Sequence, residues 1–158
     1  MLKEITISHL VKSEDLNHHG TLFAGRMAEW LVEGCFIAAS KLVGRPEDVV
    51  CVQIHGMTFS RSATKGDIVE LRIRVAGLGN KSITVWGKVL VNENPEPAVT
   101  GMATFVTVDG QGKSYAHGLS LPKEYIMENN EIHELAMRMK ARRSEEHTSE
   151  LQSPNTTS

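Results

Sequence analysis

The sequence predicts an α+β domain in which one long central helix is wrapped by a curved antiparallel sheet. The helix pattern at 25–44 becomes apolar nearly all round in its second half, so other elements have to cover it. Strand patterns joined by short turns follow it, as antiparallel pairing requires. No internal repeat or second domain is found, and residues 1–142 are expected to form one domain that ends in a helix.

The central helix has the clearest pattern. The segment "GRMAEWLVEGCFIAASKLVG" carries an apolar stripe at close to i, i+4, i+8 spacing, with Trp30 beside it, formed by Met27, Leu31, Cys35 and Ala38. Phe36 and Ile37 add apolar surface outside this stripe, which predicts burial over much of the circumference. Gly44 followed by Pro46 predicts the end of the helix.

Five strands are expected around this helix. The first is "KEITISHLV" at 3–11, which is rich in β-branched residues, and the next is "VVCVQIHGMTF" at 49–59. In "DIVELRIRVAG" at 67–77, apolar and charged residues alternate, as in a half-buried strand. A Gly-Asn turn leads into "KSITVWGKVLV" at 81–91, and "AVTGMATFVTV" at 98–108 is the last long strand. A second, mostly polar helix is expected from Leu121 to about Arg142.

The end of the chain changes character after Met139. The segment "RSEEHTSELQS" resembles the in-frame translation of a common sequencing adapter, and an eleven-residue match of this kind is not expected by chance. We therefore expect residues 143–158 to be an adapter read-through or a disordered tail, and leave them out of functional reasoning.

Composition narrows the class of protein. The net charge of −2 gives no broad attraction to nucleic acid or to an anionic membrane, so neither partner is expected. Cys35 and Cys51 form no C-x-x-C pair, which fits a reducing compartment. The start "MLKEITISHLV" lacks the apolar core and cleavage site of a signal peptide, and no apolar run approaches the roughly 20 residues of a membrane helix. A cytoplasmic protein is expected.

The segment "NHHGTLFAG" at 17–25 is the least generic part of the sequence. His18 and His19 are adjacent, so their side chains are expected to diverge, and no metal-ligand spacing is present. No G-x-S-x-G elbow occurs, and Cys35 on the apolar stripe is expected to be a buried structural thiol. "GTLFAG" is not followed by the Lys-Ser/Thr of a phosphate loop. No metal site is expected.

The same segment delivers the chain to a helix N-terminus, where the first amides are unpaired and the dipole is positive. Such an end can hold a developing oxyanion, and Gly25 lets a carbonyl come close. Asn17, His19 and Thr21 lie just upstream, in a position to orient water. Glu29 and Glu33, one turn apart, are candidate bases or nucleophiles. The alternative is that Asn17 and Thr21 only shape a turn and that the glutamates form a solvated stripe with Arg26. Both interpretations stay open at this point.

A family resemblance favours the first interpretation. "NHHGTLFAGRMAEWLVEGCFIAAS" resembles the signature of the hot-dog-fold acyl-CoA thioesterases, in the cytosolic acyl-CoA hydrolase branch. Three later segments resemble the same family in the same order, and the similarity covers roughly residues 8–118. They are "VQIHGMTFSRSATKGDIVELRIRV", "GNKSITVWGKV" and "GMATFVTVDGQGK".

The resemblance implies a hot-dog fold and the hydrolysis of fatty acyl-CoA to free fatty acid and CoA. It implies no cofactor, since coenzyme A is part of the substrate. Two protomers are expected to join edge to edge, as a homodimer or a higher multiple such as a tetramer or hexamer, with active sites between them. Amides near Ala24 and Gly25 would polarise the thioester, and a carboxylate assisted by Asn17 would activate water or attack. The candidates for binding CoA are Arg61, Lys65, Lys81 and Ser82.

Three positions depart from the family pattern. Relatives often have Asp or Asn where this chain has Thr21, and a proline where it has Ser62. Their helix carboxylate falls at Val32, one residue before Glu33, and one residue is about 100° of helix rotation. Glu33 is therefore the first candidate for the catalytic carboxylate, and Glu29 is the second.

Two other functions are possible on the same fold. A 3-hydroxyacyl dehydratase or hydratase would use His19 and a helix glutamate, but the proline-rich loop of such enzymes is missing, since no proline lies between Met1 and Val43. A non-catalytic acyl-CoA-binding module acting as a sensor would need a DNA-reading segment, for which the N-terminal region leaves no room. The sequence does not fix the acyl-chain length.

Overall fold

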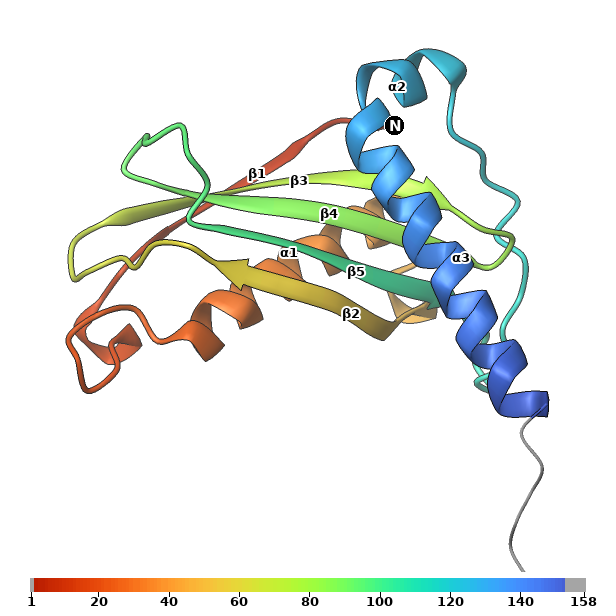
Figure 1. The fold of residues 1–158 in the computed structure, drawn as a ribbon, viewed down its shortest axis with the longest axis horizontal. Helices are drawn as coiled ribbons and strands as arrows, with labels where there is room; N and C mark the ends of the chain where they lie inside the picture. The colour runs from red at the N-terminus through yellow and green to blue at the C-terminus, as the bar shows by residue number, and fades with distance from the viewer. Residues whose placement is uncertain (1, 153–158) are drawn as a thin grey trace, which may run out of the picture.

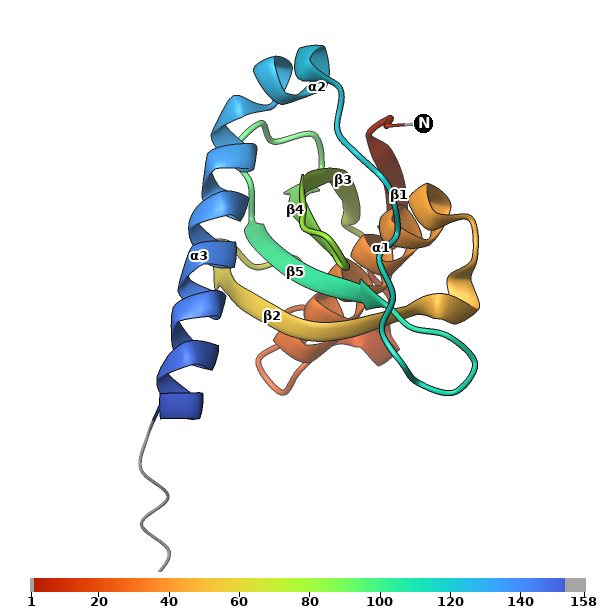
Figure 2. The same ribbon diagram turned by 90° about the vertical axis from the view of Figure 1, so that its right-hand side faces the viewer.

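The computed structural model describes residues 2–152, and the side chains of residues 2–142. The sheet has the order β1-β3-β4-β5-β2 and every neighbouring pair is antiparallel. The strands are β1 Ile5–Leu10, β2 Val49–Phe59, β3 Ile68–Leu78, β4 Ser82–Val91 and β5 Val99–Thr107. The helices are α1 Ala24–Val43, α2 Lys123–Glu128 and α3 Asn130–Gln152, with short 3-10 turns η1 Ser13–Asp15 and η2 Pro46–Asp48. Figures 1 and 2 show α1 inside the curve of the sheet and α3 across its outer face. The predicted α+β class is confirmed.

Helix α1 ends where the sequence predicts. Gly44 takes the left-handed conformation, with φ of 81°, and its N–H donates to the carbonyl of Ser40 at 2.8 Å. A side chain at this position would be strained, which is why glycine closes the helix there. At the other end Phe23 is the N-cap residue and its side chain makes no capping hydrogen bond.

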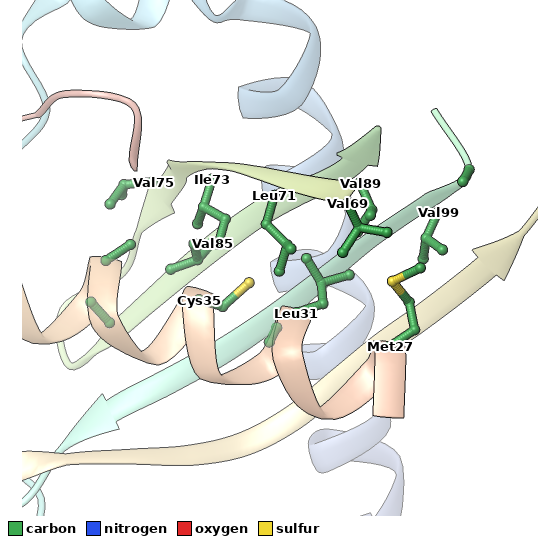
Figure 3. Close-up of a cluster of buried hydrophobic side chains, with 14 of the residues drawn as sticks. Met27, Leu31, Cys35, Val69, Leu71, Ile73, Val75, Val85, Val89 and Val99 are labelled. Atoms are coloured by element: carbon green, nitrogen blue, oxygen red, sulfur yellow. The ribbon is translucent and has the colours of Figure 1, made fainter. Parts of the chain in front are cut away.

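The inner face of α1 packs on β3, β4 and β5. Its stripe of Met27, Leu31 and Cys35 is at most 3% exposed and meets strand residues that are equally buried (Figure 3). A Cβ on Gly87 would lie only 2.6 Å from Cδ1 of Leu31, so this glycine lets the helix approach the sheet closely. Each large side chain buried in this way contributes about 1.5–3 kcal/mol. The strand residues that complete the contact are Val69, Leu71, Ile73, Val85, Val89 and Val99.

Burial of α1 around most of its circumference, which the sequence predicted, is wrong for the single chain. Phe36 and Ile37 are only half-buried, and Gly25, Glu29 and Glu33 are exposed. The sheet curves around one side of the helix, and the described residues leave the opposite side uncovered. The outward half of α1 is therefore a surface.

The C-terminal helix also differs from the prediction. It is divided at Asn129, whose side chain donates to the carbonyl of Tyr125 at 2.9 Å and accepts from Arg74 at 2.7 Å. These bonds hold the break against β3. Helix α3 then continues to Gln152, ten residues beyond Arg142, because no glycine or proline interrupts the chain before Pro154. Residues 153–158 of the expected tail lie outside the described residues.

Helix α3 covers a second, smaller apolar cluster on the outer face. Ala76, Met102 and Ala136 are buried there, and Trp86 and Leu135 pack against them. Within residues 2–152, no helix is long and apolar enough to cross a membrane.

Among the side chains described, residues 2–142, Met139 is the last residue of α3 that packs on this apolar cluster, so we expect a chain truncated after Arg142 to keep its stability. Its melting temperature should change by less than about 3 °C, which corresponds to under 1 kcal/mol for a domain of this size. Thermal unfolding followed by circular dichroism measures this. A control truncated after Asn129, which loses α3, should unfold at a clearly lower temperature. A large drop for the first truncation would show that 143–158 stabilise the fold.

Candidate active site

The loop before α1 is held between two parts of the chain. The N–H of Asn17 donates a hydrogen bond to the carbonyl of Thr21 at 2.7 Å, and the N–H of Leu22 donates to the carbonyl of Ala63 at 2.7 Å. Thr21 also forms a β-bridge with Thr64. The start of α1 is therefore fixed against the connection between β2 and β3, which is the segment 60–67.

The Asn17 side chain organises this loop. Its oxygen accepts hydrogen bonds from the N–H groups of His19 at 2.8 Å and Thr21 at 3.2 Å. Its amide nitrogen donates to the Thr21 hydroxyl at 3.0 Å. This is the turn-shaping role that asparagine plays in many loops. Among the described residues, only one of its two amide hydrogens has an acceptor, so the second is available to a bound molecule.

The expected divergence of His18 and His19 is wrong. Their ring centroids are 3.9 Å apart, at an interplanar angle of 42°. Both residues are exposed. Across the part of the chain that the structure describes, no group of three or more His, Cys, Asp or Glu is arranged to hold a metal ion.

The first two amides of α1 are unsatisfied. The N–H groups of Arg26 and Met27 both donate to the carbonyl of Phe23, at 3.0 and 3.1 Å. For Ala24 and Gly25, no acceptor is found among the described residues. These two N–H groups stand at the positive end of the helix dipole, where an oxyanion is stabilised.

A cavity of about 290 Å³ lies beside these amides. Its walls are mostly apolar, and the polar groups come from the segment after β2. The apolar lining is Leu22, Ala24, Met27, Phe59 and Ala63, and the polar lining is Ser60, Arg61 and Ser62. The sequence identified Arg61 and Ala24 in this set. It did not identify the other members as site residues, although Phe59 and Ser60 belong to the segment "VQIHGMTFSRSATKGDIVELRIRV" that resembles the family.

The two candidate carboxylates do not line this cavity. Both Glu29 and Glu33 are exposed on the outward side of α1, each about 160° around the helix from the buried Leu31, in opposite senses. Glu29 lies 3.7 Å from Arg26, which also lies 3.4 Å from the buried carboxylate of Asp15. For Glu33, no ion pair or side-chain hydrogen bond is found within the described part of the chain.

The predicted CoA-binding residues fall at two ends of the molecule. Arg61 lies at the cavity and is ion-paired with Glu96, and Lys65 is exposed in the adjoining turn. Lys81 and Ser82 lie in the β3–β4 hairpin, near the C-terminal end of α1 (Figure 1). The helix between the two ends is 20 residues long, about 30 Å. Within one protomer, Lys81 and Ser82 are therefore remote from the other candidates.

Cys35 is the buried structural thiol that the sequence predicted. Burial, followed by the nearby Cys51, raises the pKa of its thiol to about 12. A thiol with this pKa stays protonated at neutral pH, so it is not a nucleophile.

Comparison with known proteins gives a consistent result. The model of the thioesterase superfamily matches residues 19–98. The acyl-CoA thioester hydrolase YciA of Salmonella typhimurium is 31% identical over 118 residues, which cover 70% of this chain and 86% of that protein. The YciA protein of Escherichia coli is 30% identical over 121 residues, with 72% and 89% covered.

Solved structures agree. An apo-hexameric acyl-CoA thioesterase superposes with a TM-score of 0.77 at 27% identity, covering 91% of this chain and 92% of that one. An acyl-CoA hydrolase from Staphylococcus aureus, solved with butyryl coenzyme A and coenzyme A, has a TM-score of 0.73 at 25% identity, with 92% and 89% covered.

The segment that lines the cavity is anchored by Asp67. Its carboxylate accepts from the Thr64 N–H and from the Asn92 side chain, both at 2.8 Å. The Thr64 amide first, and then Asn92, hold the pKa of Asp67 below its usual range. Because the pKa of Asp67 is lower in the folded than in the unfolded protein, its ionised carboxylate stabilises the fold at pH values above the unfolded-state pKa of about 3.9. This contribution is lost as the pH falls through the lowered pKa of the folded protein.

We therefore expect Asp67→Asn to melt at a lower temperature than the unmodified chain at pH 7. The gap should narrow only as the pH falls below about 3.9 and through the lowered pKa of Asp67, because the carboxylate then becomes protonated and loses its charge. Differential scanning calorimetry at pH 7 and at a series of values below about pH 4 measures the gap. Glu93→Gln, which neutralises an exposed carboxylate of the neighbouring loop, is the control and should show no such gap. A gap for Asp67→Asn that is independent of pH would contradict the charge-assisted anchor.

Proposed function

Because the chain belongs to the thioesterase superfamily, we propose that it hydrolyses fatty acyl-CoA to free fatty acid and coenzyme A. The observation that carries this proposal is the pair of unsatisfied amides of Ala24 and Gly25 beside a largely apolar cavity. Such a site can hold a carbonyl oxygen and an aliphatic chain together. The acyl-CoA hydrolases among its relatives support the same substrate class.

The reaction needs a polarised carbonyl and an activated water. The thioester oxygen accepts hydrogen bonds from the Ala24 and Gly25 amides, where the helix dipole stabilises the charge that develops during attack. Water adds to the carbonyl carbon and gives a proton to a carboxylate, the C–S bond breaks, and CoA leaves as the thiolate. Loss of a donor in such an oxyanion hole typically lowers the rate about 10²–10³-fold.

Glu33 is the carboxylate we assign to this step. Glu29 is already close to Arg26, whereas Glu33 keeps its oxygens for water or substrate. The side chain faces away from its own cavity, so it works in a site that a second copy completes. Asn17 contributes its second amide hydrogen, with Thr21 fixing its orientation, and orients the water or the carbonyl. His19 is exposed in the same loop and at most helps to position water or substrate.

The β2 edge is where a second copy pairs. β2 ends the sheet, and it exposes Val50, Val52 and Ile54 at 42, 42 and 50%. An unpaired edge with exposed apolar residues is a surface that proteins normally cover. The related apo-thioesterase is hexameric. We assign a homodimer joined through β2, or a multiple of it.

This pairing also explains how Lys81 and Ser82 can belong to a CoA site although they are remote from the cavity of their own protomer. Antiparallel pairing of β2 with its own copy reverses the second molecule, so its β3–β4 hairpin comes to the end where this α1 begins. Lys81 of the partner subunit then joins Arg61 and Lys65 around one CoA. Positive side chains from both copies are suited to its phosphate groups.

The catalytic assignment predicts that Glu33→Gln lowers kcat at least about 10²-fold, because a positioned base is worth 10²–10⁴ in rate. KM should change little. Asn17→Ala should give a comparable loss, while His18→Ala should cost far less, and a chelator should affect none of these proteins. Thiol release from acyl-CoA of several chain lengths is the assay.

Glu29→Gln is the matched control for Glu33→Gln. If Glu29→Gln is inactive and Glu33→Gln is active, the helix register of the carboxylate is wrong. If both are active, this protein does not use a carboxylate of α1. Hydration of crotonyl-CoA by the unmodified chain, without thiol release, would instead show a hydratase.

The assembly predicts that Ile54→Glu converts the dimer to a monomer and lowers activity with it. A buried, unpaired charge at a β-edge interface opposes association strongly. Ile68→Glu is the control, because Ile68 is exposed to a similar degree, 53%, but lies at the start of β3. Sedimentation velocity at micromolar concentration separates the two states. A stable, active monomer of the unmodified chain would overturn the dimer and the shared site.

A further inference from the structure

The residue that caps α1 has an unusual position. Phe23 is 56% exposed, although phenylalanine is normally among the most buried residues. Its chain neighbours Leu22 and Ala24 both line the cavity, and Phe23 does not. The ring lies instead against Gly25. At the start of α1, Ala24 therefore lines the cavity, and the Phe23 ring covers the place where a side chain of Gly25 would stand.

The contact between the ring and Gly25 is close. A Cβ placed on Gly25 would lie 2.5 Å from Cε2 of Phe23 and 2.9 Å from Cζ. Real side chains do not approach to such distances, so any residue larger than glycine would displace the ring. The Phe23 ring thus occupies the space that a side chain at position 25 would take, so a larger residue there requires the exposed ring to move.

We propose that Phe23 is a positioning residue for thioester hydrolysis, whose ring shields the Ala24 and Gly25 amides from water and packs against the bound thioester. This inference rests on the proposed function. An apolar wall lowers the local dielectric, and hydrogen bonds from the amides to a developing oxyanion are then stronger. Water held away from the amides no longer competes for them.

Exposure of the ring supports a contact with a ligand. The Phe23 backbone is fixed, since its N–H donates to the carbonyl of the buried Asp15 at 2.9 Å and its carbonyl accepts two bonds from α1. A rigid backbone with an exposed aromatic ring suits contact with an aliphatic or thioester group, because little freedom is lost on binding. Leu10 is exposed to the same extent, 55%, but lies at the end of β1.

Steady-state thiol release tests the proposal first on three single variants. Phe23→Ala should lower kcat about three- to tenfold, the range that one aromatic contact is worth, with KM changed less than about twofold. Phe23→Leu should restore most of the loss, because it keeps an apolar wall. Leu10→Ala, the matched control, should stay within about twofold of the unmodified enzyme.

Gly25→Ala completes the test through a double-mutant cycle. Alone it should lower kcat at least as much as Phe23→Ala, because the new methyl group displaces the ring. Added to Phe23→Ala it should cause little further loss, and it should raise the melting temperature, since alanine is the better helix former. An equal loss from Gly25→Ala in both backgrounds would show that the glycine serves the substrate and not the ring.

The outcomes separate this inference from the proposed function. If the unmodified chain releases no thiol from any acyl-CoA, both fail. If it is active and Phe23→Ala is equally active, only the role of Phe23 is overturned. A loss that appears wholly in KM, or that Phe23→Leu does not relieve, also overturns it.

Discussion

The close approach of α1 to the sheet is the contact on which the rest of the structure depends. Leu31 packs where Gly87 and Gly101 present bare backbone, at Cβ distances of 2.6 and 3.0 Å that leave no room for a side chain. Because this contact fixes the distance of α1 from the sheet and its rotation, the N-terminus of α1 lies beside the segment 60–67 that follows β2. The first amides of α1 are unpaired as at any helix start, and this packing places them near the cavity.

Short polar links then fix the loops around this frame. Asp67 and Asn92 tie the segment after β2 to the loop between β4 and β5, and Asn17 folds the loop before α1 on itself. Farther away, the Tyr115 hydroxyl donates to the buried carboxylate of Asp48, which fastens the chain after β5 to the start of β2. Each link uses a side chain that accepts at least two hydrogen bonds: Asn17 from two backbone N–H groups, Asp67 from one backbone N–H and two side chains, and Asp48 from the side chains of Arg45 and Tyr115.

Sequence patterns predicted the positions of the helices and strands better than they predicted the side-chain contacts between them. The five strands and α1 were placed to within two residues, because periodicity and glycine stops are local signals. The break at Asn129 was missed, since it depends on Arg74, which is distant in sequence. The tilted contact of His18 with His19 was missed for a different reason. It depends on the side-chain and backbone conformation of these two residues, which no residue pattern encodes. At the site, the sequence found the loop, the amides and Arg61, but not the ring of Phe23 over Gly25.

Three features of the single protomer have no explanation within that protomer. The β2 edge is unpaired, Glu29 and Glu33 face away from the cavity, and Lys81 lies at the opposite end of α1. The flank of α1 toward β2 carries the half-buried Val32 and Phe36, where the carboxylate of the related enzymes would otherwise fall. In the homodimer that we propose, a second copy paired through β2 would cover that flank and bring its β3–β4 hairpin to the start of this α1. This one association would account for the exposed strand, the outward carboxylates and the distant lysine together, whereas a monomeric enzyme would need a separate explanation for each.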